Sequence, residues 1–214
     1  MRDPHAYRLG ILGSGKGSNA AAIADACAAG TLPARVAVVI SDVANAAILD
    51  RARERGLEAL YIAPGKFRSK LDEAAEAAYL QALRKAEVDL VVLAGFMRIL
   101  KGEILRAFAH KVVNIHPALL PAFPGLEAWK QALEYGVKTT GVTVHFVDQG
   151  IDTGPIIAQE TTPVLPGDTA ETLHARIQEV EHKLYPVVIG ALARGEIWVE
   201  GRQTVWRNHD REAA

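Results

Sequence analysis

Residues 7–19 read YRLGILGSGKGSN, a short apolar run that passes into a turn with glycine at positions 10, 13, 15 and 17. An alanine-rich stretch with the composition of a helix follows, at about 19–29. A strand, a glycine-rich turn and a helix, in this order, open many proteins with a parallel sheet. The segment therefore indicates a fold of the α/β class.

The rest of the N-terminal half repeats this alternation of strand and helix. The run VDLVVLA at 88–94 is almost entirely apolar, as a strand buried on both faces of a sheet must be. Further strands are expected at 36–40, 57–62 and 111–115, and helices at 44–55, 67–87 and 103–109. Such spacings imply right-handed βαβ crossovers, so we expect an open, mostly parallel twisted sheet with helices on both faces.

The pattern changes after residue 115. Residues 116–125 contain three prolines and end in glycine, which predicts an irregular loop. The long helix expected at 168–190 would open with a capping box formed by Asp168 and Glu171. Other expected elements are a helix at 127–135, antiparallel strands at 139–147 and 156–163, and a hairpin at 198–200 and 204–206. We expect a single domain that ends in a frayed tail, 207–214.

The composition is that of an ordinary globular protein. Of 214 residues half are hydrophobic, and 24 basic and 25 acidic residues give a formal net charge of -1. This balance disfavours nucleic acid as a partner, because phosphate backbones attract clusters of basic residues. Cys27 is the only cysteine, so an internal disulfide and a thiolate metal cluster are excluded. No apolar run reaches membrane-spanning length and no signal-peptide pattern is present, so we expect a cytoplasmic protein without membrane contact.

The glycine-rich turn favours an anion site. Small residues let backbone N–H groups approach a phosphate, and the helix N-terminus adds partial positive charge; the alternative is a tight turn without a ligand. Two nucleotide-binding fingerprints are incomplete here, because Gly17 stands where a P-loop needs Ser or Thr, and Ser18 stands at the third glycine of a dinucleotide motif. Asp42, after the second strand, would supply the ribose-binding acid of a dehydrogenase. A NAD-binding module therefore remains open from this half alone.

Polar residues gather where the fifth strand ends. Asn114 and His116 alternate there, so both side chains lie on one side of the chain, at the sheet edge where α/β proteins bind ligands. The pair supplies a hydrogen-bond donor and a proton-transfer group. His145, on an alternating strand, is expected to support the core or the site wall. Asp148 and Asp152 flank a turn, and residue chemistry leaves open which one reaches His116. No close pair of ligand residues predicts a metal site.

Motifs along nearly the whole chain resemble the folate-dependent formyltransferases, and within them the phosphoribosylglycinamide formyltransferase (glycinamide ribonucleotide transformylase) family. In chain order they are SGKGSN at 14–19, LAGFMRIL at 93–100, NIHP at 114–117, LLP at 119–121, GVTVHFV at 141–147, DTGP at 152–155, QEVEH at 178–182 and YP at 185–186. Each is weak alone, but their order and spacing are specific. The resemblance implies a Rossmann-like enzyme that transfers a formyl group from 10-formyltetrahydrofolate, without a metal, to the amine of glycinamide ribonucleotide in purine biosynthesis.

The resemblance also implies three groups of site residues. The catalytic group is Asn114, His116 and Asp152, so the family pattern chooses between the two aspartates. The ribonucleotide-binding group consists of Gly17, Ser18, Asn19, Gln178 and Glu181. The folate-binding group consists of Lys70, Met97, Arg98, Ile99, Leu100 and Asn114, partly through main-chain atoms. The domain would then comprise a phosphate- and ribonucleotide-binding half, about 7–112, and a catalytic and folate-binding half, about 113–206.

Three residues depart from the family pattern. Lys70 stands where an arginine is usual, Ala118 where serine is common, and Asp42 where asparagine is expected. Lysine replaces a two-pronged guanidinium with a single point charge. Rival functions are a formyltetrahydrofolate hydrolase, a methionyl-tRNA formyltransferase and a non-catalytic nucleotide-binding module. The first two usually carry an extra domain, for which we expect no room here. The expected partners are small molecules, and the expected state is a monomer or homodimer.

Overall fold

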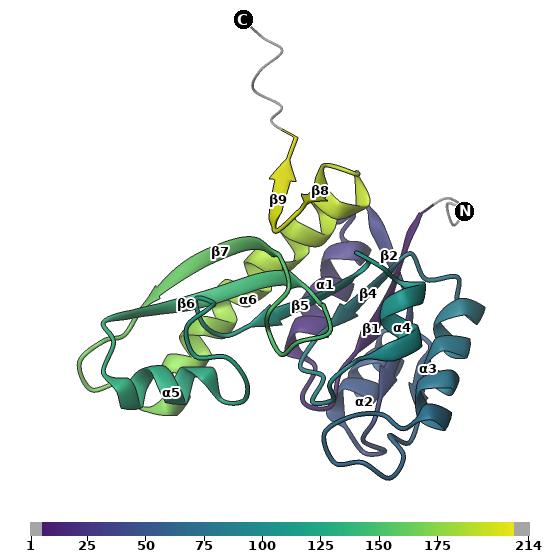
Figure 1. Cartoon of the computed structure of the whole chain (residues 1–214), viewed down its shortest axis with the longest axis horizontal. Helices are drawn as coiled ribbons and strands as arrows, with labels where there is room; N and C mark the ends of the chain where they lie inside the picture. The colour runs from purple at the N-terminus through teal and green to yellow at the C-terminus, as the bar shows by residue number, and fades with distance from the viewer. Residues whose placement is uncertain (1–5, 208–214) are drawn as a thin grey trace, which may run out of the picture.

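Within residues 6–207, which the computed structural model describes, seven strands form one sheet in the order β3-β2-β1-β4-β5-β6-β7 (Figure 1). The first five along the chain run parallel: β1 (Tyr7–Leu12), β2 (Ala34–Ser41), β3 (Ala59–Tyr61), β4 (Leu90–Leu93) and β5 (Val112–His116). Two antiparallel strands extend the sheet beyond β5: β6 (Thr139–Phe146) and β7 (Ile156–Pro163). The predicted mostly parallel α/β sheet with antiparallel additions is confirmed.

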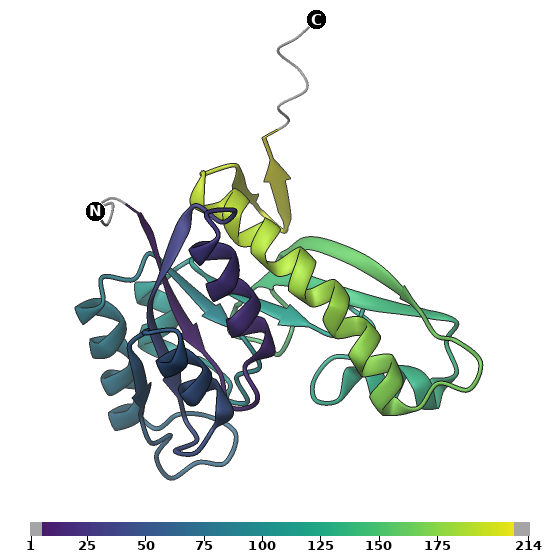
Figure 2. The same ribbon diagram turned by 180° about the vertical axis from the view of Figure 1, so that it is seen from behind.

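Helices cover both faces of this sheet. One face carries α1 (Ser18–Ala28), α2 (Ala47–Glu54) and α6 (Ala170–Ala193), which lie in front of the sheet in Figure 2. The other face carries α3 (Glu73–Lys85) and α4 (Gly102–Ala107), while α5 (Ala128–Tyr135) packs against α6. In β4, Val92 belongs to the core beneath the first set of helices, and its neighbour Val91 to the core beneath the second. Alternate side chains of a strand face opposite sides, so such a strand must be apolar throughout.

The helix α3 begins later than predicted, at Glu73 instead of residue 67. The reason is Asp72, whose carboxylate accepts hydrogen bonds from the backbone N–H groups of Ala75 (2.9 Å) and Lys66 (3.1 Å). An aspartate that caps a helix in this way marks its first turn. The preceding residues run instead as an irregular connection toward residue 99. All other helices and strands begin and end within three residues of their predicted bounds.

The predicted capping box of α6 is wrong by one residue. Thr169 is the N-cap, and it exchanges hydrogen bonds with Thr172. Asp168 instead binds the guanidinium of Arg176 through both carboxylate oxygens, at 2.7 and 2.8 Å, and accepts from the Leu165 N–H. Because Arg176, two turns into the helix, binds the Asp168 carboxylate, Asp168 does not cap the helix.

The predicted hairpin is present as β8 (Ile197–Glu200) and β9 (Gln203–Trp206). It lies over the start of β7, where Thr204 Oγ1 donates to the Ile156 carbonyl and Trp206 Nε1 to the Ile157 carbonyl. Most of the predicted tail, from residue 208, lies outside the described residues. Among the helices between residues 6 and 207, none has the length and apolar character needed to cross a membrane.

Candidate active site

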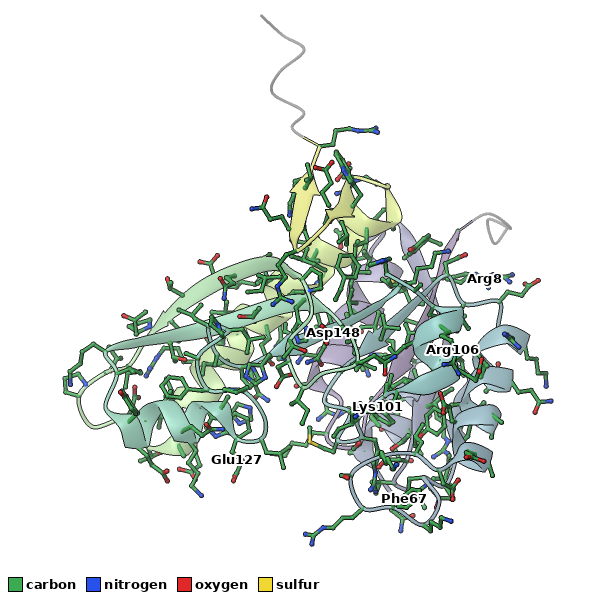
Figure 3. The ribbon with its side chains drawn as sticks, in the orientation of Figure 1. Arg8, Phe67, Lys101, Arg106, Glu127 and Asp148 are labelled. Carbon is green, nitrogen blue, oxygen red and sulfur yellow. The ribbon has the colours of Figure 1, made fainter. Side chains whose placement is uncertain are left out.

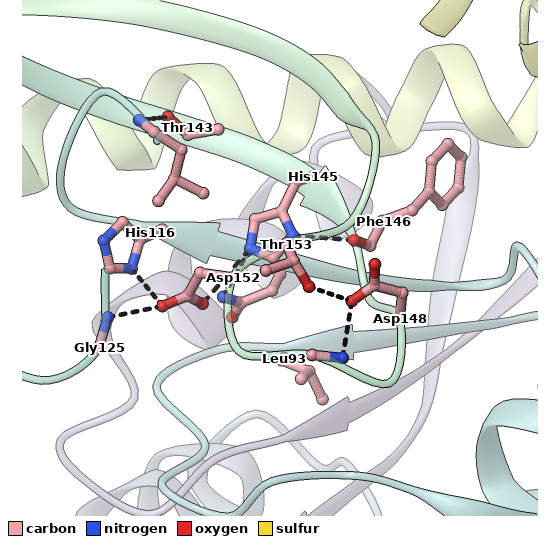
Figure 4. A network of polar contacts seen from close by, with 12 residues as sticks. Leu93, His116, Gly125, Thr143, His145, Phe146, Asp148, Asp152 and Thr153 are labelled. Atoms are coloured by element: carbon pink, nitrogen blue, oxygen red, sulfur yellow. Dashed lines mark hydrogen bonds and ion pairs between the residues drawn. The ribbon is translucent and has the colours of Figure 1, made fainter. Parts of the chain in front are cut away.

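The polar residues predicted at the sheet edge come together in one cluster (Figure 4). Asn114 and His116 lie on β5, and Asp152 lies in the connection between β6 and β7. His116 Nδ1 is 3.5 Å from Asp152 Oδ2, and both side chains are largely buried. An amide, an imidazole and a carboxylate therefore share one small volume at the carboxyl end of β5.

His145 also belongs to this cluster, although the sequence predicted for it only a supporting place in the core or the site wall. Its Nδ1 lies 2.8 Å from the Phe146 carbonyl, and its Nε2 lies 3.1 Å from Asn114 Nδ2. A carbonyl can only accept, so Nδ1 carries the proton and Nε2 accepts from the Asn114 amide. Burial lowers the pKa of His145, against the opposing effects of the Phe146 carbonyl and Asp152, and this favours the same neutral ring.

This contact fixes which way the Asn114 amide faces. One N–H of Nδ2 is used by His145, so the amide cannot flip without losing that bond. The second N–H is then held in a constant direction. Asn114 and His145 are direct cross-strand partners of β5 and β6, so their contact depends on the strand register. The alternating pattern of the strand at 139–147 predicts which face of the sheet His145 occupies. It does not predict that Asn114 is its partner on the neighbouring strand.

Asp152 and Asp148 have different roles in the turn between β6 and β7. Asp152 has a left-handed backbone, with φ of 54°, and its Oδ2 accepts from the Gly125 N–H at 2.8 Å. Asp148 accepts from the Gly150 N–H and the Thr153 hydroxyl, at 3.0 and 2.6 Å, which is ordinary turn chemistry. The geometry therefore directs Asp152 toward the cluster and keeps Asp148 in the turn.

The loop after β5 closes over the cluster from the other side. His116 Nε2 lies 2.8 Å from the Phe123 carbonyl. The Thr143 hydroxyl donates to the Ala118 carbonyl at 2.7 Å and accepts from the Leu120 N–H at 3.0 Å. The Thr143 side chain thus anchors the main chain at the start of the loop, and the fully buried Ala118 methyl takes no part in these bonds. The usual serine at this position is not needed for the anchor.

The glycine-rich turn has the geometry of an anion site. Gly17, the N-cap of α1, has φ of 74°, and a Cβ atom there would lie 2.7 Å from Ile48 side-chain atoms. Only glycine fits this position without strain. No side chain caps α1, so the N–H groups of its first turn remain directed at the space before the helix.

Asn19 and Glu181 connect this turn with α6. Asn19 Nδ2 donates to Glu181 Oε2 at 2.8 Å, while Asn19 Oδ1 is buried without a partner. Glu181 is 4% exposed, and burial raises the pKa of its carboxyl to about 7 although the bond from Asn19 acts in the opposite direction. Gln178 lies one helical turn earlier on α6 and is half-buried. The sequence-predicted ribonucleotide group thus occupies one region.

The predicted folate residues have unequal access to solvent. Met97 is 54% exposed, whereas Leu100 is 3% exposed and packs in the core beneath α3 and α4. Ile99 forms a bridge with Lys70, whose ammonium lies 4.5 Å from the centre of the Phe67 ring. Leu100 is therefore almost inaccessible to solvent, whereas Met97 is exposed to it.

A cavity of about 230 Å³ lies beside these residues, between the connection before α3 and the start of α4. Phe67 and Lys101, both labelled in Figure 3, line it together with Lys70. Asp72 and Glu76 also line it, so both cations and carboxylates face this cavity.

Asp42 does not have the free carboxylate that a dinucleotide-binding protein needs. Its two oxygens accept from Ser14 Oγ at 2.5 Å and from Arg98 Nε at 2.7 Å, and the side chain is 1% exposed. A ribose diol would have to displace both donors. The interpretation of Asp42 as a ribose-binding acid is therefore not supported.

The chain is similar to known formyltransferases over most of its length. A family model described as formyl transferase matches residues 7–189. Phosphoribosylglycinamide formyltransferase of Bacillus subtilis is 42% identical over 185 residues, which are 86% of this chain and 94% of that protein. The trifunctional purine biosynthetic protein adenosine-3 of Drosophila melanogaster is 44% identical over 88% of this chain, which spans only 14% of that protein. A glycinamide ribonucleotide transformylase 1 structure from Symbiobacterium toebii has a TM-score of 0.91 and 50% identity, and the match covers 96% of each chain.

Proposed function

The chain belongs to the formyl transferase family, and from that premise we propose that it transfers the formyl group of 10-formyltetrahydrofolate to the amine of 5′-phosphoribosylglycinamide. The products are formylglycinamide ribonucleotide and tetrahydrofolate, in de novo purine biosynthesis. The observation that carries the proposal is the cluster of Asn114, His116 and Asp152 on the same sheet edge as the glycine-rich turn. The polar cluster suits acyl transfer, and the glycine-rich turn suits the binding of a phosphate.

The reaction needs charge stabilisation and the net transfer of one proton from the amine to the folate nitrogen. The amine nitrogen attacks the formyl carbon, an oxyanion develops, and the bond from that carbon to the folate nitrogen breaks. A proton leaves the amine and a proton reaches the departing folate nitrogen. Asn114 would donate to the oxyanion, because His145 holds its amide so that the second N–H stays available.

His116 would serve as the proton carrier and second donor. Its ring faces two acceptors, Asp152 Oδ2 on one side and the Phe123 carbonyl on the other. Two acceptors suit the doubly protonated ring, which has a donor on each nitrogen. Asp152 would hold the ring through Nδ1, while the N–H that now meets Phe123 can be redirected to substrate. Asp152 would also help, through water, to take the proton from the amine.

The two substrates would occupy neighbouring parts of the sheet edge. The phosphate fits the turn at Gly17, Ser18 and Asn19, where α1 has uncapped N–H groups. Glu181 and Gln178 would meet the sugar of the ribonucleotide. The folate would lie along the main chain of residues 97–100, with its acidic tail toward Lys70. We further propose a cytoplasmic enzyme, monomeric or homodimeric, that acts on small molecules, on the basis of its composition.

A transfer assay tests this function. Purified protein with 10-formyltetrahydrofolate should change the folate absorbance only when glycinamide ribonucleotide is added. Formate release at the same rate without the acceptor would identify a hydrolase instead. Absence of both reactions, together with calorimetric binding of NAD, would favour the nucleotide-binding module.

A further inference from the structure

A buried carboxylate outside the catalytic cluster joins several loops of the sheet edge. Asp42 follows β2, and its side chain is almost completely excluded from solvent. Oδ1 accepts from the Ser14 hydroxyl and Oδ2 from the Arg98 guanidinium. Ser14 follows β1 and Arg98 follows β4, so one carboxylate ties together the ends of three neighbouring strands.

Ser14 passes this contact on to the segment after β4. Its hydroxyl oxygen accepts from the Met97 N–H at 2.8 Å, and its own N–H donates to the Gly95 carbonyl at 2.9 Å. The neighbouring Gly13 allows close approach, because a Cβ atom there would lie 2.8 Å from the Ala94 carbonyl oxygen. The glycine-rich turn and residues 94–97 are therefore held at a fixed distance.

Arg98 extends the network to a fourth loop. Its Nη1 donates to the carbonyls of Phe67 (3.2 Å) and Arg68, in the connection before α3. The next residue, Ile99, donates its N–H to the Ser69 carbonyl at 2.9 Å. The guanidinium thus aligns residues 67–69 beside residues 97–99 while Asp42 neutralises its charge.

We propose that Asp42 is a positioning residue of the folate site: through Ser14 and Arg98 it sets the main chain of residues 97–99 relative to the glycine-rich turn. This inference rests on the proposed function, because it takes residues 97–99 as the folate wall. Both carboxylate oxygens of Asp42 are already engaged, by Ser14 and by Arg98, so Asp42 acts on the site through these two residues. Replacing a buried ion pair by apolar groups of similar size is often neutral for stability. A contribution to stability is therefore a poor explanation for the Asp42–Arg98 pair.

The ribonucleotide end of the turn is anchored independently of Asp42. Gly17 packs on Ile48, whose N–H donates to the Gly15 carbonyl at 3.1 Å. Asn19 is held by Glu181. None of these contacts passes through Asp42. Loss of its carboxylate should therefore disturb folate binding and leave ribonucleotide binding nearly unchanged.

Asparagine at this position would preserve part of the network. Its Oδ1 can accept from Arg98, and its NH₂ group can donate to Ser14 Oγ, which has a second lone pair. The charge on the guanidinium would then be uncompensated. The folate KM of Asp42→Asn should consequently lie between those of wild type and Asp42→Ala. Ser14→Ala should lose the hydrogen bond to Met97 but keep the ion pair between Asp42 and Arg98.

Steady-state kinetics with both substrates test the inference. For Asp42→Ala we expect the KM for 10-formyltetrahydrofolate to rise about tenfold and the KM for glycinamide ribonucleotide to change less than about twofold, since only the folate wall would shift. Asp42→Asn and Ser14→Ala should shift the same KM by smaller factors. The matched control is Asp50→Ala, an exposed aspartate on α2, which should behave as wild type.

Tetrahydrofolate titration by calorimetry gives a second readout and should show the same order of variants. Equal changes in both KM values, or an unchanged folate KM in folded Asp42→Ala, would overturn the inference. If Asp42→Ala does not fold, the inference is tested with Asp42→Asn and Ser14→Ala. An unchanged folate KM in both of these variants would overturn it. Inactive wild type and inactive Asp50→Ala would instead refute the proposed function, and the positioning role with it.

Discussion

His145 Nε2 lies 3.1 Å from Asn114 Nδ2, across the pairing of β5 and β6, and this contact determines the orientation of the amide. We predict that His145→Ala lowers kcat by roughly tenfold or more while the chain stays folded, because Asn114 can then rotate away from the oxyanion. His145→Gln keeps an acceptor and should retain more turnover than His145→Ala. Equal rates for the two variants would show that the acceptor at position 145 is irrelevant.

Asn114→Ala and His116→Ala should each lose most turnover. Removing one oxyanion donor typically costs roughly 100- to 1,000-fold in kcat. Thermal unfolding should stay close to that of wild type for Asn114→Ala, since that side chain is only partly buried. The measurement is steady-state formyl transfer with purified variants, and near-normal rates in both would refute the catalytic assignment.

The two aspartates of the β6–β7 turn should separate in the same assay. Asp152→Asn removes the charge beside His116, although the amide oxygen can still accept from Gly125, so we expect a large loss of kcat. Asp148→Asn should keep most activity, because its contacts are confined to the turn. The opposite ranking would mean that the turn rearranges when substrate binds.

Much of this molecule follows from local sequence patterns, and the remainder depends on contacts between distant segments. The apolar run at 88–94 and the alternation of Asn114 and His116 predicted a central strand and a polar strand end, and both are present. The contact of His145 with Asn114 depends on the β5–β6 register, which no local pattern encodes. The partners of Asp42, Ser14 and Arg98, come from two other loops. The sequence around Asp42 does not reveal them, and without them an aspartate after a strand is compatible with a ribose contact.

The cap of α6 illustrates a second limit. Asp168 and Thr169 are both good N-cap residues, and the choice between them depends on Arg176, two turns away. The start of α3 is similar, because the apolar spacing of residues 67–87 suits a helix throughout. Asp72 ends the preceding connection by capping the helix. The spacing of apolar residues does not indicate where such a bond between a side chain and the backbone forms.

Glu181 should make stability depend on pH. Its folded-state pKa is raised to about 7 from 4.5, so the folded protein binds more protons between these values than the unfolded chain does. The free energy of unfolding should therefore fall as pH rises from about 4.5 to about 7, by about 3 kcal/mol, and be flat above. Urea titrations at pH 5 and pH 8 should show this fall reduced in Glu181→Gln and preserved in Glu179→Gln, an exposed neighbour. The same fall in both variants would exclude Glu181 as its source.

Gly17 and Gly15 offer a matched test of the anion turn. A Cβ atom at Gly17 would meet Ile48 at 2.7 Å in a backbone with φ of 74°, whereas one at Gly15 would have nothing within 4 Å. The left-handed backbone alone costs an alanine about 1–2 kcal/mol, and the clash would push α1 away from α2. We therefore expect Gly17→Ala to raise the KM for glycinamide ribonucleotide at least about tenfold and to lower the melting temperature, while Gly15→Ala stays near wild type on both counts. A normal ribonucleotide KM in folded Gly17→Ala would show that the phosphate does not bind at the N-terminus of α1, since the turn cannot accept that methyl group without moving.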